Sequence, residues 1–236
     1  MSAVADNWHR VRERIERAAH RAGRRGAEVA VCAVTKNVPM PRIREAVEAG
    51  ARILGENRVQ EAGSKILSEK DLPAGLSWHF IGKLQRNKAR RAVELFDVIE
   101  SVDSALLARK LAELGRGRNR PVPVFLEVLT SDEGTKSGLP MGEVEQVLAE
   151  IDGLSGISLR GLMTMAPFTD EERPARASFA ALRGLRERFG RDEWELSMGM
   201  TGDFEIAVEE GSTLVRVGTG IFGRTPPGAV GTNGER

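Results

Sequence analysis

The sequence predicts an α/β protein built as a (β/α)8 barrel, a TIM barrel, with an extra helix at its N-terminus. Short strand-like segments alternate with helical segments along the chain, which is typical of a parallel sheet covered by helices. The strand-like segments number eight, and eight parallel strands are what closes a barrel. An open doubly wound sheet is the competing layout, because two of the strands are short and weak.

The first two elements have the clearest patterns. Apolar residues recur at helical spacing from Trp8 through Ile15, and Gly23 is a suitable end for this amphipathic helix. The segment 29–34 then reads VAVCAV, a continuous apolar run typical of a strand buried on both faces. Cys32 is therefore expected inside the barrel, as a small buried hydrophobic residue rather than a nucleophile.

The remaining elements alternate in order. Further strands are expected at 52–54, 77–81, 97–100, 122–129, 157–163, 194–196 and 213–217. Helices are expected near 40–49, 57–69, 84–94, 104–115, 141–150, 171–189 and 203–210. Thr169 is followed by Glu172 three residues on and then by Pro174, which together predict a capped helix start.

Composition excludes several classes of protein. Lys and Arg number 35 against 34 Asp and Glu, so no net field recruits nucleic acid or an anionic membrane. A single cysteine allows no intramolecular disulfide and argues against a Cys-based metal site, so no metal is expected. The N-terminus lacks a signal-peptide core, and no apolar run approaches the roughly 18 residues of a membrane span. We expect a cytoplasmic protein with one domain over 1–223 and a disordered tail over 224–236.

Polar residues gather where the predicted strands end. In a barrel of this kind the functional face is formed by the C-terminal ends of the strands, so these side chains share one mouth. They are Lys36, Asn57, His79, Ser101, Ser197, Thr201, Arg216, Gly218 and Thr219.

Two parts of this set suggest a phosphorylated aldehyde. Gly218 and Thr219 open a glycine-rich turn that presents backbone N–H groups to an anion, and Thr201 adds a hydroxyl from the preceding loop. Lys36, expected on the far side of the same mouth, can reach a carbonyl carried by the phosphate ligand. Because pyridoxal 5′-phosphate (PLP) carries both groups and its aldehyde condenses with a lysine amine, PLP is the predicted cofactor.

The motifs together resemble a known family. AVTKNVP, GENRVQE, WHFIGKLQRNK, KSGLP, GLMTMAP and LSMGMTGDFEIAVEEGSTLVRVGTGIFG occur in the order and at the spacing of the pyridoxal phosphate homeostasis protein family. Members of this family are single-domain relatives of the alanine racemase N-terminal barrel. The resemblance runs from about Val29 to Gly223, nearly the whole chain.

The resemblance implies roles for the residues of the mouth. It makes Lys36 the Schiff-base lysine and Arg216 the arginine that faces the pyridine nitrogen. It places Thr201, Gly218 and Thr219 on the phosphate. Asn57, His79 and Ser197 match residues around the cofactor.

Four positions depart from the usual family pattern. Thr35 and Thr201 stand where serine is common, and each keeps a hydroxyl, so we expect the roles to persist in a tighter site. The pair at 37–38 replaces a more usual Thr-containing pair, which affects local loop contacts only.

Arg216 and the missing tyrosine bear on catalysis. A permanently charged arginine disfavours protonation of the pyridine nitrogen and so weakens the electron sink of PLP. Racemisation also needs a second base, which in alanine racemases is a tyrosine, and this chain contains none. We assign no catalytic residue and expect a protein that stores, buffers or delivers PLP within the cell. A weak PLP-dependent amino-acid racemase, with His79 or a water as a poor base, is the alternative.

Partners other than the cofactor are less constrained. The resemblance leaves open whether PLP-dependent enzymes receive the cofactor, and the missing second domain favours a monomer. The basic segment 84–96 offers no single stripe of charge and no aromatic stacking surface, so we expect no nucleic-acid binding.

Overall fold

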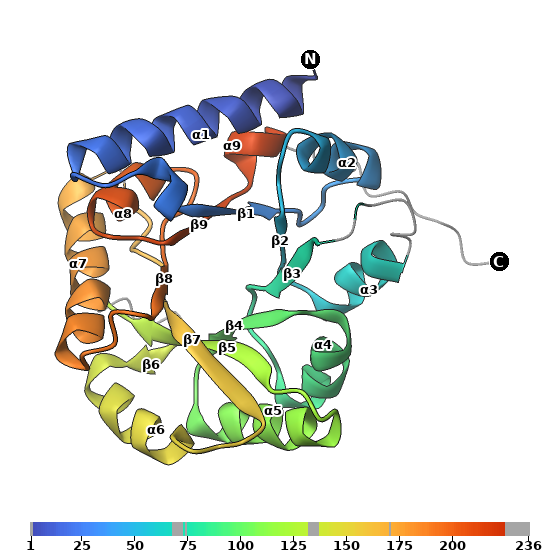
Figure 1. Ribbon diagram of the computed structural model, residues 1–236, viewed down its shortest axis with the longest axis vertical. Helices are drawn as coiled ribbons and strands as arrows, with labels where there is room; N and C mark the ends of the chain where they lie inside the picture. Colours follow the sequence, from blue (N-terminus) through green and yellow to red (C-terminus); the bar gives the residue numbers. More distant parts are fainter. Residues whose placement is uncertain (1, 68–72, 74, 132–136, 170, 225–236) are drawn as a thin grey trace.

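The barrel is closed and parallel, as predicted. The computed structural model describes residues 2–67, 73, 75–131, 137–169 and 171–224. Its barrel strands are β1 (Ala30–Val34), β2 (Ile53–Glu56), β3 (Ser77–Phe80), β4 (Val98–Val102), β5 (Val122–Leu129), β7 (Ile157–Met163), β8 (Glu195–Ser197) and β9 (Leu214–Val217). They pair in the order β4-β3-β2-β1-β9-β8-β7-β5, and a β4–β5 pairing closes the ring (Figure 1). The competing open sheet is therefore excluded.

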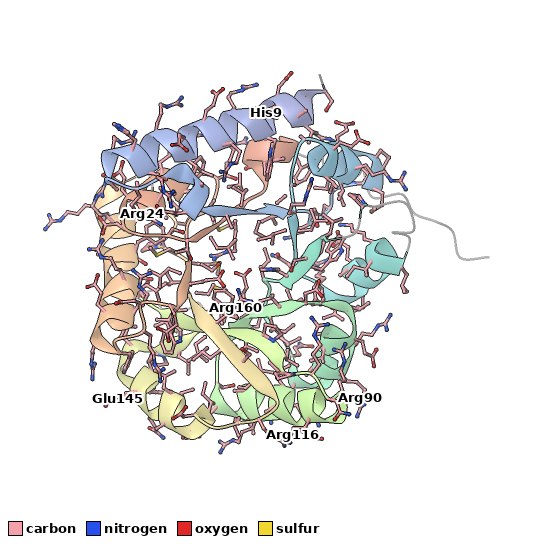
Figure 2. All side chains as sticks on the ribbon, in the orientation of Figure 1. His9, Arg24, Arg90, Arg116, Glu145 and Arg160 are labelled. Atoms are coloured by element: carbon pink, nitrogen blue, oxygen red, sulfur yellow. The ribbon has the colours of Figure 1, made fainter. Side chains whose placement is uncertain are left out.

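Helices surround this ring on the outside (Figure 1). They are α1 (Ala3–Arg21), α2 (Met40–Glu48), α3 (Val59–Leu67), α4 (Ala89–Leu95), α5 (Ala105–Gly117), α6 (Val144–Ile151), α7 (Glu172–Arg188), α8 (Phe204–Glu209) and α9 (Thr219–Phe222). Single 3-10 turns lie at Gly26–Glu28, Arg86–Lys88 and Met141–Glu143. Charged side chains such as Arg24, Arg90, Arg116 and Glu145 project outward from the ring (Figure 2).

Details of the prediction differ from the structure at a few places. A short strand that was not predicted, β6 (Leu139–Pro140), extends the sheet beside the end of β5. Helix α7 begins at Glu172 without a side-chain cap, so the capping prediction at Thr169 is wrong. The Thr169 hydroxyl instead accepts the N–H of Glu171 at 3.0 Å, a local turn that ends before the helix starts. Positions 68–69 of the third predicted helix, and 225–236 of the predicted tail, lie outside the described residues.

The predicted N-terminal helix packs against the last two helices of the barrel. The side chains of Trp8 and Ile15 on α1 are buried, and α1 lies along α8 and α9 (Figure 1). Asn7 Nδ2 donates to the carbonyl of Ile221 in α9 at 3.0 Å, and Arg14 pairs with Glu205 in α8 at 2.7 Å. Because α8 and α9 each follow a loop of the predicted mouth, α1 supports that mouth from outside.

The barrel interior has an apolar layer below a polar one. The apolar layer is a separate cluster of buried side chains: Cys32, Val98, Phe125, Met163 and Leu214. Two residues further along three of these strands, toward the C-terminal ends, the side chains become charged: Glu100, Glu127 and Arg216. The expectation for Cys32 is confirmed, since its side chain is buried and burial raises the pKa of its thiol well above the ordinary value.

Glu127 carries a carboxyl group whose pKa this interior raises. Glu127 is 3% exposed, and burial raises the pKa of its carboxyl group to about 7. A hydrogen bond from Ser137 Oγ at 3.2 Å and the charge of Arg216 lower the pKa, whereas the charge of Asp103 raises it further. Desolvation outweighs these groups, so the carboxyl is held close to half-protonated at neutral pH.

Replacing Glu127 by glutamine should make the free energy of unfolding less sensitive to rising pH. The pKa of Glu127 is raised from 4.5 to about 7 on folding, so the folded state binds more protons across that window. The stabilisation contributed by protonated Glu127 is fully present below the unfolded-state pKa of 4.5. It is lost as the pH rises through the folded-state pKa of about 7. We expect the wild type to lose up to roughly 3 kcal/mol relative to Glu127→Gln between about pH 5 and pH 8.

Urea unfolding at the two pH values measures this difference. Glu94→Gln is the matched control, because Glu94 is a half-exposed partner of Arg91 on α4. Equal pH dependence in the wild type and Glu127→Gln would contradict the assignment of a raised pKa to this carboxyl.

Candidate functional site

Lys36 occupies a turn directly beyond the end of β1. Its side chain is exposed, and within the described part of the chain no hydrogen bond or ion pair involves its ammonium group. The next residue, Asn37, has a φ of 57°, which is left-handed backbone that asparagine tolerates better than most residues. The chain therefore turns sharply just past the lysine and leaves its amine available for a ligand.

The predicted anion turn lies next to Lys36, and the expectation that they face each other across the mouth is wrong. Closure of the barrel pairs the first strand with the last, with Ala33 opposite Val217. A Cβ placed on Gly218 would lie 3.4 Å from the Cβ of Val34. The anion turn and the lysine therefore lie on adjacent strands at the same rim.

The loop between β8 and α8 completes the anion turn. The N–H of Gly220 donates to Thr201 Oγ1 at 3.2 Å, so this loop and the start of α9 are joined. Gly199 has a φ of 96°, and a Cβ there would lie 2.5 Å from the Cβ of Ala207. Only glycine fits this close approach, which holds the loop against α8 and presents Thr201 beside Thr219.

Arg216 is the buried cation of the mouth. It is 2% exposed, and its guanidinium donates to Ser197 Oγ at 2.6 Å and to the carbonyl of Thr164 at 2.8 Å. Ser197 in turn donates to Glu100 Oε2 at 2.5 Å. The arginine and the carboxylate are 3.9 Å apart, so the serine bridges two opposite charges inside the barrel.

His79 binds the other oxygen of the same carboxylate. Its Nδ1 lies 2.5 Å from Glu100 Oε1, and its Nε2 lies 3.1 Å from Ser77 Oγ. Burial works to raise the pKa of Glu100, but the hydrogen bond and charge of His79, with Arg216 and Ser197, hold that pKa below its ordinary value. Glu100 is therefore ionised and accepts a hydrogen bond from the Nδ1–H group of His79.

Asn57 stands at the rim beyond β2. Its backbone is pressed against the loop after β3, because a Cβ on Gly82 would lie 2.3 Å from the carbonyl oxygen of Asn57. Ser101 Oγ donates to the carbonyl of Gly82 at 2.5 Å and fixes that loop from β4. The Oδ1 atom of Asn57 is buried and has no hydrogen-bond partner among the described residues. A buried acceptor of this kind is suited to a donor that a ligand brings.

Sequence reasoning missed the acidic residues of the interior. Glu100 lies in the segment VIES and Glu127 in VFLEVL, and both were taken as parts of apolar strands. A glutamate within an otherwise buried strand is itself a signal, because ionisable side chains are rarely fully buried without a partner. Which partner each carboxyl finds depends on strands that are distant in the sequence.

Other kinds of site are not indicated by the described residues. In the described part of the chain, no group of three His, Cys, Asp or Glu side chains is placed to hold a metal ion. Over the same part, no helix has the length and apolar character needed to cross a membrane.

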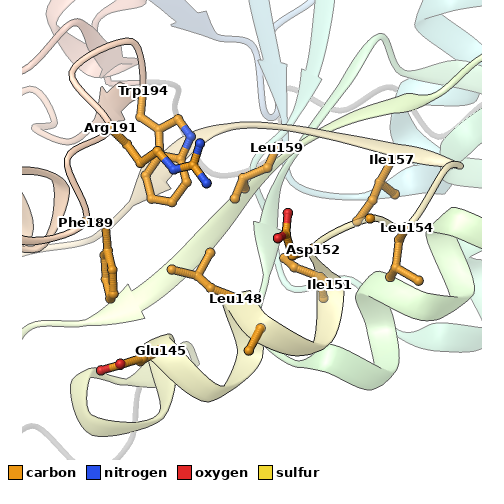
Figure 3. A pocket seen from close by; sticks show the side chains of 12 residues that line it. Glu145, Leu148, Ile151, Asp152, Leu154, Ile157, Leu159, Phe189, Arg191 and Trp194 are labelled. Atoms are coloured by element: carbon orange, nitrogen blue, oxygen red, sulfur yellow. The ribbon is translucent and has the colours of Figure 1, made fainter.

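A cavity of about 380 Å³ lies away from the mouth. Its apolar wall includes Leu148 of α6 and Leu159 of β7, and Phe189 and Trp194 close its other side (Figure 3). Leu159 belongs to the first half of β7 and Trp194 directly precedes β8, so the cavity lies toward the N-terminal ends of the strands. None of the predicted site residues lines it.

Comparison with known proteins agrees with this architecture. The family model of the alanine racemase N-terminal domain matches residues 2–226. The pyridoxal phosphate homeostasis protein of Escherichia coli (strain K12) is 40% identical over 228 residues, covering 94% of this chain and 97% of that protein.

Solved structures extend the comparison. PipY of Synechococcus elongatus PCC7942, solved with PLP bound, is 40% identical with a TM-score of 0.76, covering 89% of this chain and 100% of that one. Alanine racemase of Corynebacterium glutamicum is 18% identical with a TM-score of 0.69, covering 98% of this chain and 64% of that one, a likeness of fold alone. Since a family model and a 40% identical relative both span nearly its whole length, the chain belongs to the pyridoxal phosphate homeostasis protein family, built on the alanine racemase N-terminal barrel.

Proposed function

We propose that this protein binds PLP at the C-terminal mouth of its barrel, holds it as a Schiff base on Lys36, and serves intracellular PLP homeostasis. The observation that carries the proposal is the packing of Gly218 against Val34, which places the anion turn beside the lysine. Its relative PipY has been solved with PLP bound. Storage, buffering and delivery of the cofactor are all consistent with such a site.

Thr201, Gly218 and Thr219 would hold the phosphate. Thr201 Oγ1 accepts the N–H of Gly220, and among the described residues no acceptor takes its hydroxyl proton. That proton can be donated to a phosphate oxygen, alongside the N–H groups at the start of α9. A charged acceptor strengthens each of these hydrogen bonds.

Arg216 and Asn57 would flank the ring. The contacts of Arg216 with Ser197 and the Thr164 carbonyl hold the guanidinium in one orientation while leaving other N–H groups for a ligand. A fixed positive charge disfavours a proton on a nearby pyridine nitrogen. When bound, PLP supplies an aldehyde and an electron sink, and this arginine weakens the sink.

Lys36 would form the covalent link. Its ε-amine would supply the nitrogen of a Schiff base with the aldehyde of PLP, with two amine protons and the carbonyl oxygen lost as water. No oxidant or reductant is required. Because this step is reversible, the same lysine can retain the cofactor and release it.

The contacts of His79 favour a carrier over a racemase. Its Nδ1 is held by Glu100, and its Nε2 lies against Ser77, the first residue of β3, so Nε2 points away from the C-terminal mouth where an amino acid would bind. The chain also has no tyrosine to act as a second base. A weak racemase remains the alternative activity, the transfer of PLP to recipient enzymes remains an open alternative, and the monomeric state remains a prediction.

Borohydride reduction should fix the cofactor on Lys36. The purified protein is expected to absorb near roughly 420 nm, as Schiff bases of PLP do, and to lose that band on reduction. Peptide mapping should find the reduced label on Lys36, and Lys36→Ala should remove it. A label on Lys65 or Lys136 in the wild type would overturn the assignment.

Thr201→Val should weaken binding of PLP but not of pyridoxal. The substitution keeps the shape of the side chain and removes the hydroxyl that would contact the phosphate. One hydrogen bond to a charged group is worth about 1.5–3 kcal/mol, so affinity for PLP should fall on the order of 10–10²-fold. Fluorescence titration with both ligands measures this, with the exposed Thr169→Val as control. Equal losses for both ligands would place the phosphate elsewhere.

Amino-acid turnover should be far below enzyme-like rates. A missing general base costs about 10²–10⁴-fold, so racemisation of alanine should stay well under the usual range of roughly 1–10³ per second. The holo-protein is incubated with saturating L-alanine, and the D-isomer is followed by chiral chromatography. Turnover of several per second that disappears in Lys36→Ala would establish the racemase instead.

A further inference from the structure

A buried cluster of charges lies directly behind the Lys36 turn. Glu56 is the last residue of β2 and is fully buried, while Lys65 and Glu61 come from α3. Lys65 Nζ donates to Glu56 Oε1 at 2.6 Å and to Glu61 Oε1 at 2.9 Å. The side chain of Lys65 is 11% exposed, so the cluster is shielded from solvent on most sides.

This cluster is bonded to both neighbours of Lys36. Lys65 Nζ donates to the backbone carbonyl of Thr35 at 2.7 Å, and the backbone N–H of Asn37 donates to Glu61 Oε1 at 2.7 Å. The Thr35 hydroxyl lies 2.6 Å from Glu56 Oε1. One ammonium group and two carboxylates thus hold the residue before and the residue after the lysine.

The geometry points to a positioning role for Lys65: with Glu61, it fixes the Thr35–Asn37 turn so that the amine of Lys36 meets a bound aldehyde. This inference rests on the proposed Schiff base at Lys36. A role in overall stability alone would not require bonds to both residues that flank the lysine. Lys65 itself is committed to three acceptors, which makes it a support rather than a second point of attachment.

The electrostatics of Glu61 agree with this role, whereas burial raises the pKa of Glu56 in the same cluster. Burial acts to raise the pKa of Glu61, but the hydrogen bonds from Lys65 and from the N–H of Asn37 hold that pKa below its ordinary value. Glu61 is therefore ionised at neutral pH and accepts both bonds at full strength. The left-handed backbone at Asn37 is a conformation that needs such external contacts to persist.

Removing the ammonium group should slow the covalent step while leaving the phosphate site intact. Lys65→Met keeps most of the side-chain volume and removes the hydrogen bonds to Thr35, Glu56 and Glu61. The rate of Schiff-base formation with PLP, followed by the growth of absorbance near roughly 420 nm, should fall on the order of 10–10²-fold, as expected for a misplaced reacting group. Pyridoxine 5′-phosphate has the phosphate but no aldehyde, and its affinity should stay within about twofold, since the anion turn is untouched.

Two further variants make the test specific. Glu61→Gln keeps an oxygen for the Asn37 N–H but loses the charge, so it should slow the covalent step by a smaller factor. Lys110→Met is the control, because Lys110 pairs with Glu113 at 2.8 Å on the outer helix α5. It should match the wild type with both ligands. If Lys65→Met does not fold, Glu61→Gln carries the test.

The outcomes separate this inference from the proposed function. Wild-type rates in Lys65→Met, or in Glu61→Gln where that variant carries the test, would overturn the positioning role. Equal weakening of PLP and pyridoxine 5′-phosphate would also overturn it, by indicating general damage to the fold. A wild-type protein that shows no label on Lys36 after reduction would instead overturn the proposed Schiff base.

Discussion

Hydrogen bonding between β1 and β9 joins the first strand of the barrel to the last, and the arrangement of the mouth depends on it. The pairing runs over four register positions, from Ala30 opposite Leu214 to Ala33 opposite Val217. β1 leads into the turn that carries Lys36 and β9 leads into the anion turn, so both turns lie at the C-terminal rim of the barrel. In the proposed complex, the phosphate held by one turn and the aldehyde reached from the other belong to the same small molecule. The pairing of these strands brings the two turns close enough for one cofactor to contact both.

The polar interior requires an equally specific arrangement. An arginine that is 2% exposed would be strongly unfavourable without a counter-charge, and Glu100 on the opposite wall provides one. Ser197 bridges the two groups, and His79 takes the remaining oxygen of the carboxylate. The result is a hydrogen-bonded chain across the barrel from β3 through β4 and β8 to β9. These hydrogen bonds fix the orientation of the Arg216 guanidinium, so that its charge has a defined position toward a ligand.

The orientation of the polar side chains bears on whether the proposed site retains a cofactor or catalyses a reaction. An acid–base catalyst needs an atom that can exchange a proton with its substrate, and Nε2 of His79 lies against Ser77 at the start of β3 rather than toward the mouth. The amine of Lys36, by contrast, has no partner among the described residues, and Thr201 keeps a hydroxyl proton to donate. The groups left available at the mouth are those that we propose bind PLP, whereas His79 is turned away from it. Behind Lys36, the side chains of Glu56, Glu61 and Lys65 hydrogen bond to one another and to the Lys36 turn rather than facing the ligand site.

Much of the fold follows from local sequence. The alternation of short apolar runs with amphipathic segments predicted eight strands in a parallel barrel, and the N-terminal helix followed from its spacing of apolar residues. The polar residues at the strand ends could be placed at one mouth, because all strands of a parallel barrel point the same way. Motif order identified the family before any contact was known.

Only the tertiary structure decided which of these residues meet. The sequence suggested that Lys36 faces the anion turn, whereas closure of the ring makes them neighbours. The partners of Glu100 come from strands roughly 20 and 100 residues away, and those of Lys65 from the end of β1 and from β2. A continuous apolar run shows that a strand is buried on both faces, but it carries no period that tells which of its side chains point inward. The positions of charges inside a barrel therefore depend on register and closure, which are properties of the assembled sheet.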